Sequence, residues 1–585
     1  MHLYVLYFKK NWGEKRIRGF FMKKEKNAWL IDFCLSWVGR KYSKHLNKAA
    51  KNCKATEEQT LRGILEFAKD TEWGKAHNYA EILEAPNGEE LYARWQKNQP
   101  VCDYEDFRPF IERHKHGEEN ILFPGKPMMY ATTSGTTKEP KWIPITERYY
   151  TEVFSKMTKV WLYTFMMHRP KVFWGKCVSI VGKDVETHAP DGTVCGSVSG
   201  VTQRDCPDFI KCLYSAPRSI FGISSYRARN YALMRTGIEQ NVTSMVACNP
   251  STILELQKTV DENFDEMVND IEKGTLSAKY EIEPEIRAEL EKFYTPNPER
   301  AKVLRELKAK YGQVLPKYYW PDFQFLTTWK CGNTHVYMDK FKGYFPSEML
   351  HQEFGYFASE CRAGLVMNGK DDTVPFTHYH FFEFTSADDM DNPNPKFYQL
   401  HELEVGKRYL VYITTYSGLY RYNMNDMIEV TGHYNTIPTF QFIQKVNGII
   451  SMTGEKVHER QFMSAVAEAE EESGIKTRFY VGFADVENSL YHFYFDFVES
   501  GMTQEKTQEF ANLVDEKLKK INVEYESKRD SFRIKEPVGH LLRENAFEMY
   551  KMAALEKGAR DGQFKMNLLM QDEKRHEMFK ELVQK

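Results

Sequence analysis

The chain has 585 residues, of which 42% are hydrophobic and 14% aromatic, so it is long and apolar enough for several folded domains and too apolar for a disordered protein. Its 80 basic and 82 acidic residues nearly cancel. This balance argues against a dedicated binder of nucleic acid or of anionic membranes, which carries a surplus of positive charge.

Apolar runs and cysteines indicate the compartment. The first apolar stretch, Trp29 to Val38, is interrupted by Asp32 and lacks a small-residue cleavage site, so it does not resemble a signal peptide. No run reaches the roughly 18 to 20 apolar residues that a membrane span requires. The ten cysteines form no Cys-x-x-Cys pair, which fits neither a zinc site nor a secreted disulfide framework. We expect a cytoplasmic protein without a membrane span, translated from Met1 or from Met22.

Helices are expected early in the chain and again in its middle. From Ala28 to Gly74 the apolar residues recur at helical spacing. The pair Asn249-Pro250 is typical of a helix N-cap and first helical position, and the apolar face that follows ends near Gly274. Two charged helices are expected between Glu281 and Lys310, separated by a Thr-Pro-Asn-Pro break at Thr295.

Short β-rich runs are spread among these helices. They fall at Lys171–Val181, Phe323–Thr328, Tyr379–Phe384 and Tyr409–Thr414. Helices mixed with such strands are typical of an α/β protein. We therefore predict a large, layered α/β domain over residues 1–440, with a helical lead-in.

A smaller α+β unit is expected in the final quarter of the chain. The same mixture of helices and strands recurs here on a smaller scale. We expect a helix near Glu459–Glu472, strands near Phe479 and over Leu490–Val498, and a helix near Thr503–Ile521. Their extent is close to a typical domain size. We predict a second domain over residues 449–585, joined to the first near residues 445–448.

The stretch Tyr130-Ala-Thr-Thr-Ser-Gly-Thr-Thr-Lys-Glu-Pro-Lys141 carries the strongest chemical signal. Hydroxyl groups and turn-exposed backbone amides can follow the oxygens of a triphosphate, and Lys141 can neutralise charge, so we interpret the stretch as a phosphate loop. On composition alone, a Ser/Thr-rich surface turn is the alternative. A Walker A loop is excluded because the GxxxxGK[ST] spacing is absent.

The order of several motifs carries a family resemblance. Thr133 to Lys141 resembles the nucleotide loop of adenylate-forming enzymes, and the following Trp142-Ile-Pro-Ile-Thr146 is similar to that of the auxin-responsive, Gretchen Hagen type acyl-acid amido synthetases. Tyr356-Phe-Ala-Ser-Glu360 resembles the second nucleotide motif of that family, and Gly418-Leu-Tyr-Arg-Tyr-Asn-Met-Asn-Asp426 the third. The chain thus resembles a bacterial-type member of this family from about Leu61 to its C-terminus.

The resemblance implies an adenylation domain with a mobile C-terminal domain, the use of ATP and Mg²⁺, and two further substrates, a small carboxylic acid and an amine such as that of an amino acid. It also implies a set of nucleotide-binding residues: Thr133, Ser134, Gly135, Thr136, Thr137, Gly332, Tyr356, Phe357, Ala358 and Ser359. Read physically, the ring of Tyr356 could stack on a base, and Ser359 could bond a phosphate. A Ser-Glu pair by itself is more often a helix cap.

Charged residues complete the implied site. Glu360 supplies a hard oxygen ligand for Mg²⁺, and Asp426 is suited to accept bonds from both ribose hydroxyls. Lys445 falls at the basic hinge position beside the nucleotide, with Asn447 at the pivot. The resemblance assigns Lys141, Lys456 and Lys565, the last within Gly562-Gln-Phe-Lys565, as the lysines that offset charge during catalysis.

Three positions depart from the family pattern. Lys138 stands where the loop usually has glycine, which predicts a strained backbone or another path for the loop, and its ammonium could contact phosphate. Asn423 and Asn425 stand where the third motif commonly has Arg and Gly. Asp426 remains in place, but the geometry of its turn is left open.

Two other patterns are given a structural interpretation. His378 and His380 would point to one face of a predicted strand, as metal ligands can, but no third ligand is nearby and packing is favoured. The sequon Asn241-Val-Thr243 is treated as a chance match.

The predicted reaction has two steps. A substrate carboxylate attacks the α-phosphorus of ATP and releases pyrophosphate, and an amine then attacks the acyl-adenylate to give an amide, with positioning and preorganised charge as the main contributions of the enzyme. One alternative is the same activation with coenzyme A as acceptor, which gives a thioester; the Gly-Gln-x-Lys element favours the amide. Another is a nucleotide-binding scaffold without catalysis, to which Lys138, Asn423 and Asn425 would point. The sequence identifies neither the acid nor the amine, nor the oligomeric state.

Overall fold

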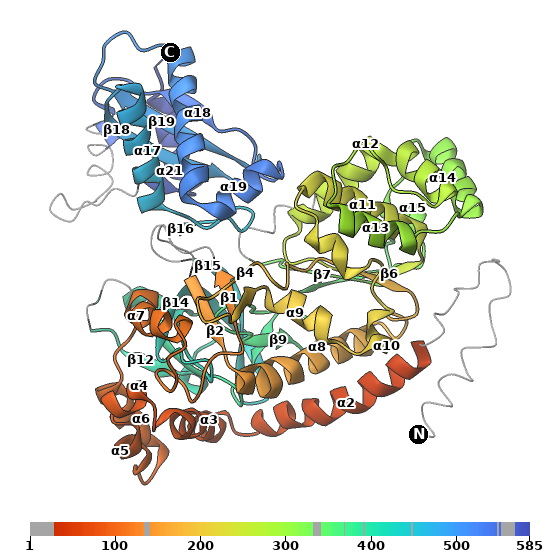
Figure 1. The fold of residues 1–585 in the computed structure, drawn as a ribbon. Coiled ribbons are helices and arrows are strands. Elements are labelled where there is room, and N and C mark those ends of the chain that lie inside the picture. Colours follow the sequence, from red (N-terminus) through yellow and green to blue (C-terminus); the bar gives the residue numbers. More distant parts are fainter. Residues whose placement is uncertain are drawn as a thin grey trace.

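The protein is described from a computed structural model, which covers residues 28–133, 141–331, 338, 341–367, 369–389, 392, 394–445, 449–546, 549–550 and 568–584. In Figure 1 the C-terminal residues, in blue, form a unit of their own above the larger remainder of the chain. The long helix α2 (Ala28–Ala49) runs along the opposite side, beside α8 (Ser155–His168). The predicted mixture of helices and strands is confirmed.

The helical lead-in is confirmed and has clear local causes. Asn52 caps one helix by accepting from the amide of Ala55, and Asp103 forms a reciprocal capping box with Asp106 at the start of another. Their apolar faces are buried in the largest core, which also contains the two sheets nearest to them. The helices after α2 are α3 (Cys53–Ala68), α4 (Glu72–Ala76), α5 (Tyr79–Leu83), α6 (Gly88–Asn98) and α7 (Tyr104–Lys115).

Two sheets hold most of the motif residues. The large antiparallel sheet has the order β12 (Phe397–Gln399), β11 (Phe381–Ser386), β13 (Arg408–Thr414), β14 (Tyr422–Tyr434), β15 (Ile437–Lys445), β10 (Thr373–Pro375) and β9 (Gly364–Val366). The second has the order β2 (Lys141–Ile145), β1 (Met129–Thr133), β5 (Val194–Gly196) and β4 (Thr187–His188). A π-helical turn, Tyr149–Phe154, leads from β2 into α8.

A parallel sheet with its own helical cover forms a separate core. Its order is β3 (Lys176–Ser179), β6 (Val242–Val246), β7 (Phe325–Thr328) and β8 (Leu350–Glu353). The neighbouring helices are α9 (Val198–Asp205), α10 (Asp208–Lys211), a 3₁₀ turn (Arg218–Gly222), α11 (Tyr226–Glu239), α12 (Ser251–Lys273), α13 (Pro284–Phe293), α14 (Pro298–Tyr311) and α15 (Pro316–Tyr319). The predicted break between α13 and α14 is confirmed.

The C-terminal unit packs helices against a four-stranded sheet of order β20 (Val538–Leu541), β19 (Leu490–Phe497), β18 (Thr477–Asp485) and β21 (Leu569–Met570). Its apolar residues form two clusters distinct from those of the remaining chain. This unit begins with a two-stranded antiparallel ribbon of β16 (Ile449–Ile450) and β17 (Val457–His458). The helices are α17 (Glu459–Ser473), α18 (Gln504–Ile521), α19 (Val523–Asp530) and α21 (Glu573–Glu581).

Three local predictions need correction. Asn249 is not the N-cap of α12: the helix begins at Ser251, and the Asn249 side-chain amide donates instead to the carbonyl of Thr453 in the C-terminal unit. The β-run predicted from Lys171 yields a strand only from Lys176, because residues 171–174 form a turn. His378 and His380 precede β11 rather than lying on a strand. In contrast, Gly274 ends α12 in the left-handed conformation, as expected of a C-terminal glycine.

Candidate active site

A buried hydrogen bond joins the second and third motifs. The hydroxyl of Tyr356 donates to Oδ2 of Asp426 over 2.5 Å, and both side chains are buried. Burial, followed by the charge of Asp426, raises the pKa of Tyr356 well above its usual range, so the phenol stays a donor. Its ring lies edge-on against Phe440 at 5.7 Å. Tyr356 therefore supports Asp426 from within the core, and its role in base stacking stays a prediction.

The strand register places Asp426 next to another predicted residue. In the antiparallel pairing of β14 with β15, Asp426 stands opposite Lys445. The two residues lie 19 positions apart in the sequence, and only the hairpin brings their backbones together. The adjacent positions 446–448, with Asn447, lie outside the described residues.

The second motif ends in a tight turn that presents Ser359 and Glu360. The amide of Ala358 donates to the carbonyl of Cys361 over 2.9 Å, and Phe357 pairs with Arg362 in a short antiparallel bridge. Ser359 and Glu360 thus occupy the corner of the turn, and both are partly exposed. The ring of Phe357 packs edge-on against the ring of Phe354, which joins the turn to the core.

Tyr422 links this turn to the first motif. Nζ of Lys141 donates to the Tyr422 hydroxyl over 3.2 Å. Burial is the main cause that raises the pKa of Tyr422 well above its usual range, and the negative charge of Glu360 is the next. The ammonium of Lys141 and the carboxylate of Glu360 therefore lie near the same phenol. Residues more than 200 positions apart meet here, which the sequence motifs alone could not show.

The first motif starts and ends in a β-hairpin. Thr133 of β1 pairs with Lys141 of β2, so the two ends of the motif lie side by side. That segment contains the predicted residues Ser134, Gly135, Thr136 and Thr137, together with Lys138. All five lie outside the described residues, as do Gly332 and Lys565. Their assignments remain predictions.

The third motif lies in an irregular part of β14 rather than in a turn, which answers the question of geometry that the substitutions left open. Asn425 adopts φ = 55°, a left-handed conformation that glycine favours and that asparagine tolerates. Oδ1 of Asn423 accepts from the amide of Asn425 over 2.8 Å and so reinforces the irregularity of β14 at this point. The two asparagines are therefore compatible with a motif that usually has glycine, and Asp426 keeps its buried position.

A buried ion pair between Arg421 of the third motif and Glu383 of β11 holds this motif in place. Nε of Arg421 lies 3.0 Å from Oε1 of Glu383, and both side chains are almost fully buried. Glu383 also accepts from Tyr92 and Trp95, and Arg421 donates to the carbonyl of Gln99 over 3.1 Å. Multiple partners are what a buried charge pair requires. No pattern in the sequence would have selected Glu383.

Lys456 lies at the contact between the C-terminal unit and the rest of the chain. It adopts φ = 48° in the turn after Thr453, and its carbonyl accepts from Asn522 over 3.3 Å. The same turn receives the amide of Asn249 from the N-terminal part. Its ammonium contacts no other predicted site residue among those the structure describes, so its catalytic assignment stays a prediction.

His378, which is half-buried, and His380, which is buried, behave as packing residues. Burial lowers the pKa of His378 to about 3 and that of His380 to about 4, so both rings are neutral near pH 7. Nε2 of His380 lies 2.7 Å from the carbonyl oxygen of Arg362. This contact supports the turn that carries Glu360.

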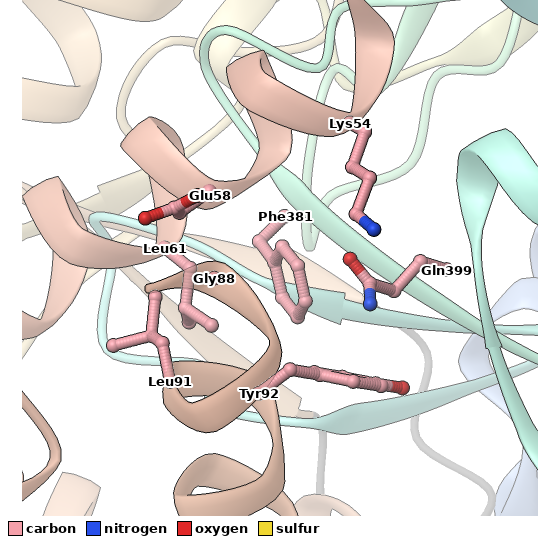
Figure 2. Close-up of a pocket in the computed structure, with 8 residues that line it drawn as sticks. All are labelled: Lys54, Glu58, Leu61, Gly88, Leu91, Tyr92, Phe381 and Gln399. Atoms are coloured by element: carbon pink, nitrogen blue, oxygen red, sulfur yellow. The ribbon is translucent and has the colours of Figure 1, made fainter. Parts of the chain in front are cut away.

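A small surface pocket lies away from the motifs, between α3, α6 and the edge of the large sheet. Figure 2 shows that the Lys54 and Gln399 side chains approach one another at one end of it, while Leu61, Leu91 and Phe381 form an apolar part. None of the predicted site residues lines this pocket. Its lining residues are Lys54, Glu58, Leu61, Gly88, Leu91, Tyr92, Phe381 and Gln399.

Comparison with known proteins gives matches along most of the chain. Three family models match in order: the GH3 family N-terminal domain at residues 42–350, the GH3 family central domain at 373–445 and the GH3 family C-terminal domain at 460–574. The N-terminal match ends in β8, the central match ends with β15, and the C-terminal match begins just after β17. Among the described residues, no helix combines the length and apolar character needed to cross a membrane.

Curated relatives and solved structures agree with these models. The chain is 23% identical over 551 residues to indole-3-acetic acid-amido synthetase GH3.3 of Arabidopsis thaliana, covering 89% of this chain and 90% of that protein. It is 28% identical over 473 residues to probable indole-3-acetic acid-amido synthetase GH3.2 of Oryza sativa subsp. japonica, covering 74% and 75%. A solved structure of GH3.15 acyl acid amido synthetase aligns with a TM-score of 0.60 at 22% identity, covering 92% of this chain and 95% of that one, which shows a common fold.

Proposed function

Because the chain belongs to the GH3 family, we propose that it is an ATP-dependent ligase that adenylates a small carboxylic acid, releases pyrophosphate and transfers the acyl group to the amine of an amino acid. The observation that carries the proposal is the cluster in which three ordered motifs meet. Lys141 contacts Tyr422, the charge of Glu360 acts on the same phenol, and Tyr356 bonds Asp426.

In this proposal each charged residue has a distinct task. Asp426, held by Tyr356, accepts hydrogen bonds from the ribose of ATP and fixes the nucleotide relative to the sheet. Lys141 lies at the end of the phosphate loop, where its ammonium offsets charge that builds up on the phosphates during attack. Lys456 and Lys565 are proposed to add positive charge from the C-terminal side. The protein contributes orientation and charge to both steps, and none of these residues forms a covalent intermediate.

The turn after Ala358 fits a magnesium-binding role. Glu360 offers a carboxylate oxygen at a partly exposed corner, and Mg²⁺ in nucleotide sites is commonly held by one or two carboxylates together with phosphate oxygens and water. When bound, Mg²⁺ supplies charge stabilisation to the phosphates. Ser359 beside it would donate to a phosphate oxygen. We also propose that residues 445–448 form the hinge between a domain over residues 1–440 and one over residues 449–585.

The proposal is tested with the first half-reaction. Purified protein with ATP, Mg²⁺ and a panel of aryl and alkyl acids should exchange labelled pyrophosphate into ATP. Asp426→Asn should weaken ATP binding by about tenfold, and Tyr412→Phe, which alters a buried tyrosine on the neighbouring strand, should leave it unchanged. Absence of exchange with every acid would favour a scaffold without catalysis.

The second half-reaction distinguishes the acceptors. An acid that supports exchange is incubated with free amino acids or with coenzyme A, and the mass of the product is measured. An amide is expected. A thioester would contradict the proposed acceptor while leaving acid activation in place.

A further inference from the structure

Three large aromatic side chains form an exposed stripe on α2. Trp29 is 61% exposed, and Phe33 and Trp37 are each 66% exposed. They stand at positions i, i+4 and i+8 of one helix, so they project from the same side of it. An aromatic side chain has roughly 150–250 Å² of surface, so the three together expose on the order of 300–500 Å² to water. An apolar patch of that size on a protein surface commonly marks an interaction site.

The other side of α2 fixes the helix to the rest of the chain. Gly39 lies so close to α8 that a methyl group placed on it would be 2.3 Å from Cβ of Tyr163. The buried residues of the helix are Ala28, Ile31, Leu35, Gly39, Leu46 and Ala49. The aromatic stripe is therefore not needed to hold α2 in place.

The aromatic side of α2 becomes basic toward the C-terminal end of the helix. Residues three or four positions apart share a side, so the stripe continues from Trp37 to Lys41, Lys44 and Lys48. All three lysines are exposed, and none forms an ion pair with a carboxylate among the residues that the structure describes. Asp32, the one acidic residue of α2, is partly buried and projects away from this side. Positive charge on this side thus lacks a counter-charge on the helix itself.

Basic residues also precede the aromatic stripe in the sequence. Within residues 23–27, Lys23, Lys24 and Lys26 outnumber the single acidic residue, Glu25. The stripe therefore has lysines before and after it. The near-zero net charge of the whole chain conceals this local surplus, which is complementary to a surface that is both anionic and apolar.

We propose that α2 docks on a membrane surface that contains anionic lipid. In this arrangement the aromatic stripe enters the headgroup region, and the lysines lie against lipid phosphates. Trp and Phe side chains favour the boundary between water and hydrocarbon, and lysines are attracted to anionic headgroups. The helix lies along the surface, since no helix in the described part of the chain has the length and apolar character to cross a membrane. The inference does not depend on the proposed ligase function.

The position of α2 in the fold suits such docking. In Figure 1 the helix, in red, lies along the edge of the molecule that is farthest from the C-terminal unit, in blue. A helix of 22 residues is about 33 Å long, so it offers an extended line of contact to a flat surface. The C-terminal unit would then face away from the membrane.

A second copy of the chain is a less suitable occupant of this side. Paired helices need apolar residues at alternating spacings of three and four. A seam through Trp29 and Phe33 would continue through Ser36 and Arg40, which are polar. The spacing of the three aromatic residues therefore fits a surface better than a partner helix.

The experiment measures co-sedimentation of the full chain with sucrose-loaded vesicles. Vesicles of phosphatidylcholine and phosphatidylserine in a ratio of about two to one are compared with vesicles of phosphatidylcholine alone. Wild-type protein should bind the anionic vesicles at least about tenfold more tightly than the neutral ones. Because the attraction is partly electrostatic, binding should weaken as the NaCl concentration is raised to about 0.5 M.

Two triple variants separate the contributions of the aromatic and the basic residues. Trp29→Ala combined with Phe33→Ala and Trp37→Ala should weaken binding to anionic vesicles by at least about tenfold. Lys41→Gln combined with Lys44→Gln and Lys48→Gln should weaken it by about 100-fold and reduce its dependence on salt. Since these side chains are exposed, thermal melting should be unchanged in both variants.

Matched controls remove exposed residues of the same kinds elsewhere. Phe293 on α13 is 48% exposed and Val303 on α14 is 38% exposed. Phe293→Ala with Val303→Ala is the control for the aromatic variant. Lys302→Gln with Lys310→Gln, at two exposed lysines of α14, is the control for the basic variant. Both controls should bind vesicles like wild-type protein.

Several results would overturn the inference. They are a folded wild-type protein that binds neither kind of vesicle, equal binding to anionic and neutral vesicles, and an aromatic variant that binds like wild-type protein. A dimer in solution that the aromatic variant dissociates would show that the stripe is an interface between copies of the chain instead. Vesicle binding is measured without ATP or acid, so absence of pyrophosphate exchange would contradict the proposed function and not this inference.

Discussion

Replacing Tyr356 with Phe removes one oxygen atom and leaves the ring in its core position against Phe440. The lost bond joins a buried phenol, 7% exposed, to a buried carboxylate, 2% exposed. A hydrogen bond to a charged group contributes about 1.5–3 kcal/mol, and water cannot replace the missing donor at such burial. We expect the free energy of unfolding to fall by about that amount. Because Asp426 would lose an orienting partner, ATP affinity should fall by about tenfold.

The assay combines chemical denaturation with ATP titration by calorimetry. Tyr412→Phe is the matched control, since Tyr412 is also 7% exposed but its hydroxyl lies 3.4 Å from that of Thr385, a long contact between neutral groups. It should cost less than about 1 kcal/mol and leave ATP affinity unchanged. If Tyr356→Phe matched this control in both measurements, Tyr356 would not organise Asp426. If stability fell while ATP affinity held, Asp426 would not be a ribose ligand.

Further predictions concern the support of the third motif and acid sensitivity. Arg421→Met leaves the Glu383 carboxylate buried without its cation and should cost about 3–5 kcal/mol by denaturation; a double variant with Glu383→Gln should recover part of this cost, and strict additivity would contradict the pairing. Asn425→Gly should be nearly neutral in stability because φ is positive there, whereas Asn425→Val should cost about 1 kcal/mol or more; equal costs would contradict the left-handed conformation of Asn425. His114 is buried, Nδ1 lies 2.9 Å from the carbonyl oxygen of Glu118, and burial lowers its pKa to about 4. The unfolded chain therefore binds this proton first as the pH falls below about 6.5, so His114 should cost about 2 kcal/mol of stability between pH 6.5 and 5, and His114→Gln should flatten that part of the pH profile.

Short-range signals were enough for much of the secondary structure. The break between α13 and α14, the glycine that ends α12, and the helices and strands of the C-terminal unit follow from hydrophobic spacing, caps and turn residues. Predictions failed where a side chain had a distant partner. Asn249 looked like a helix cap because a cap is local, yet its amide is used by Thr453, 204 residues away.

The sequence by itself determined the mixed α/β architecture, the order of the motifs and hence the family, because these depend on residue types at fixed spacing. Only the tertiary structure brought Lys141 to Tyr422 and Tyr356 to Asp426. Burial and long-range pairing depend on how sheets and helices pack, and a residue has the same local sequence pattern whether its side chain faces water or another part of the fold. The motifs could therefore be recognised in the sequence, whereas the contacts that hold them together were decided by packing.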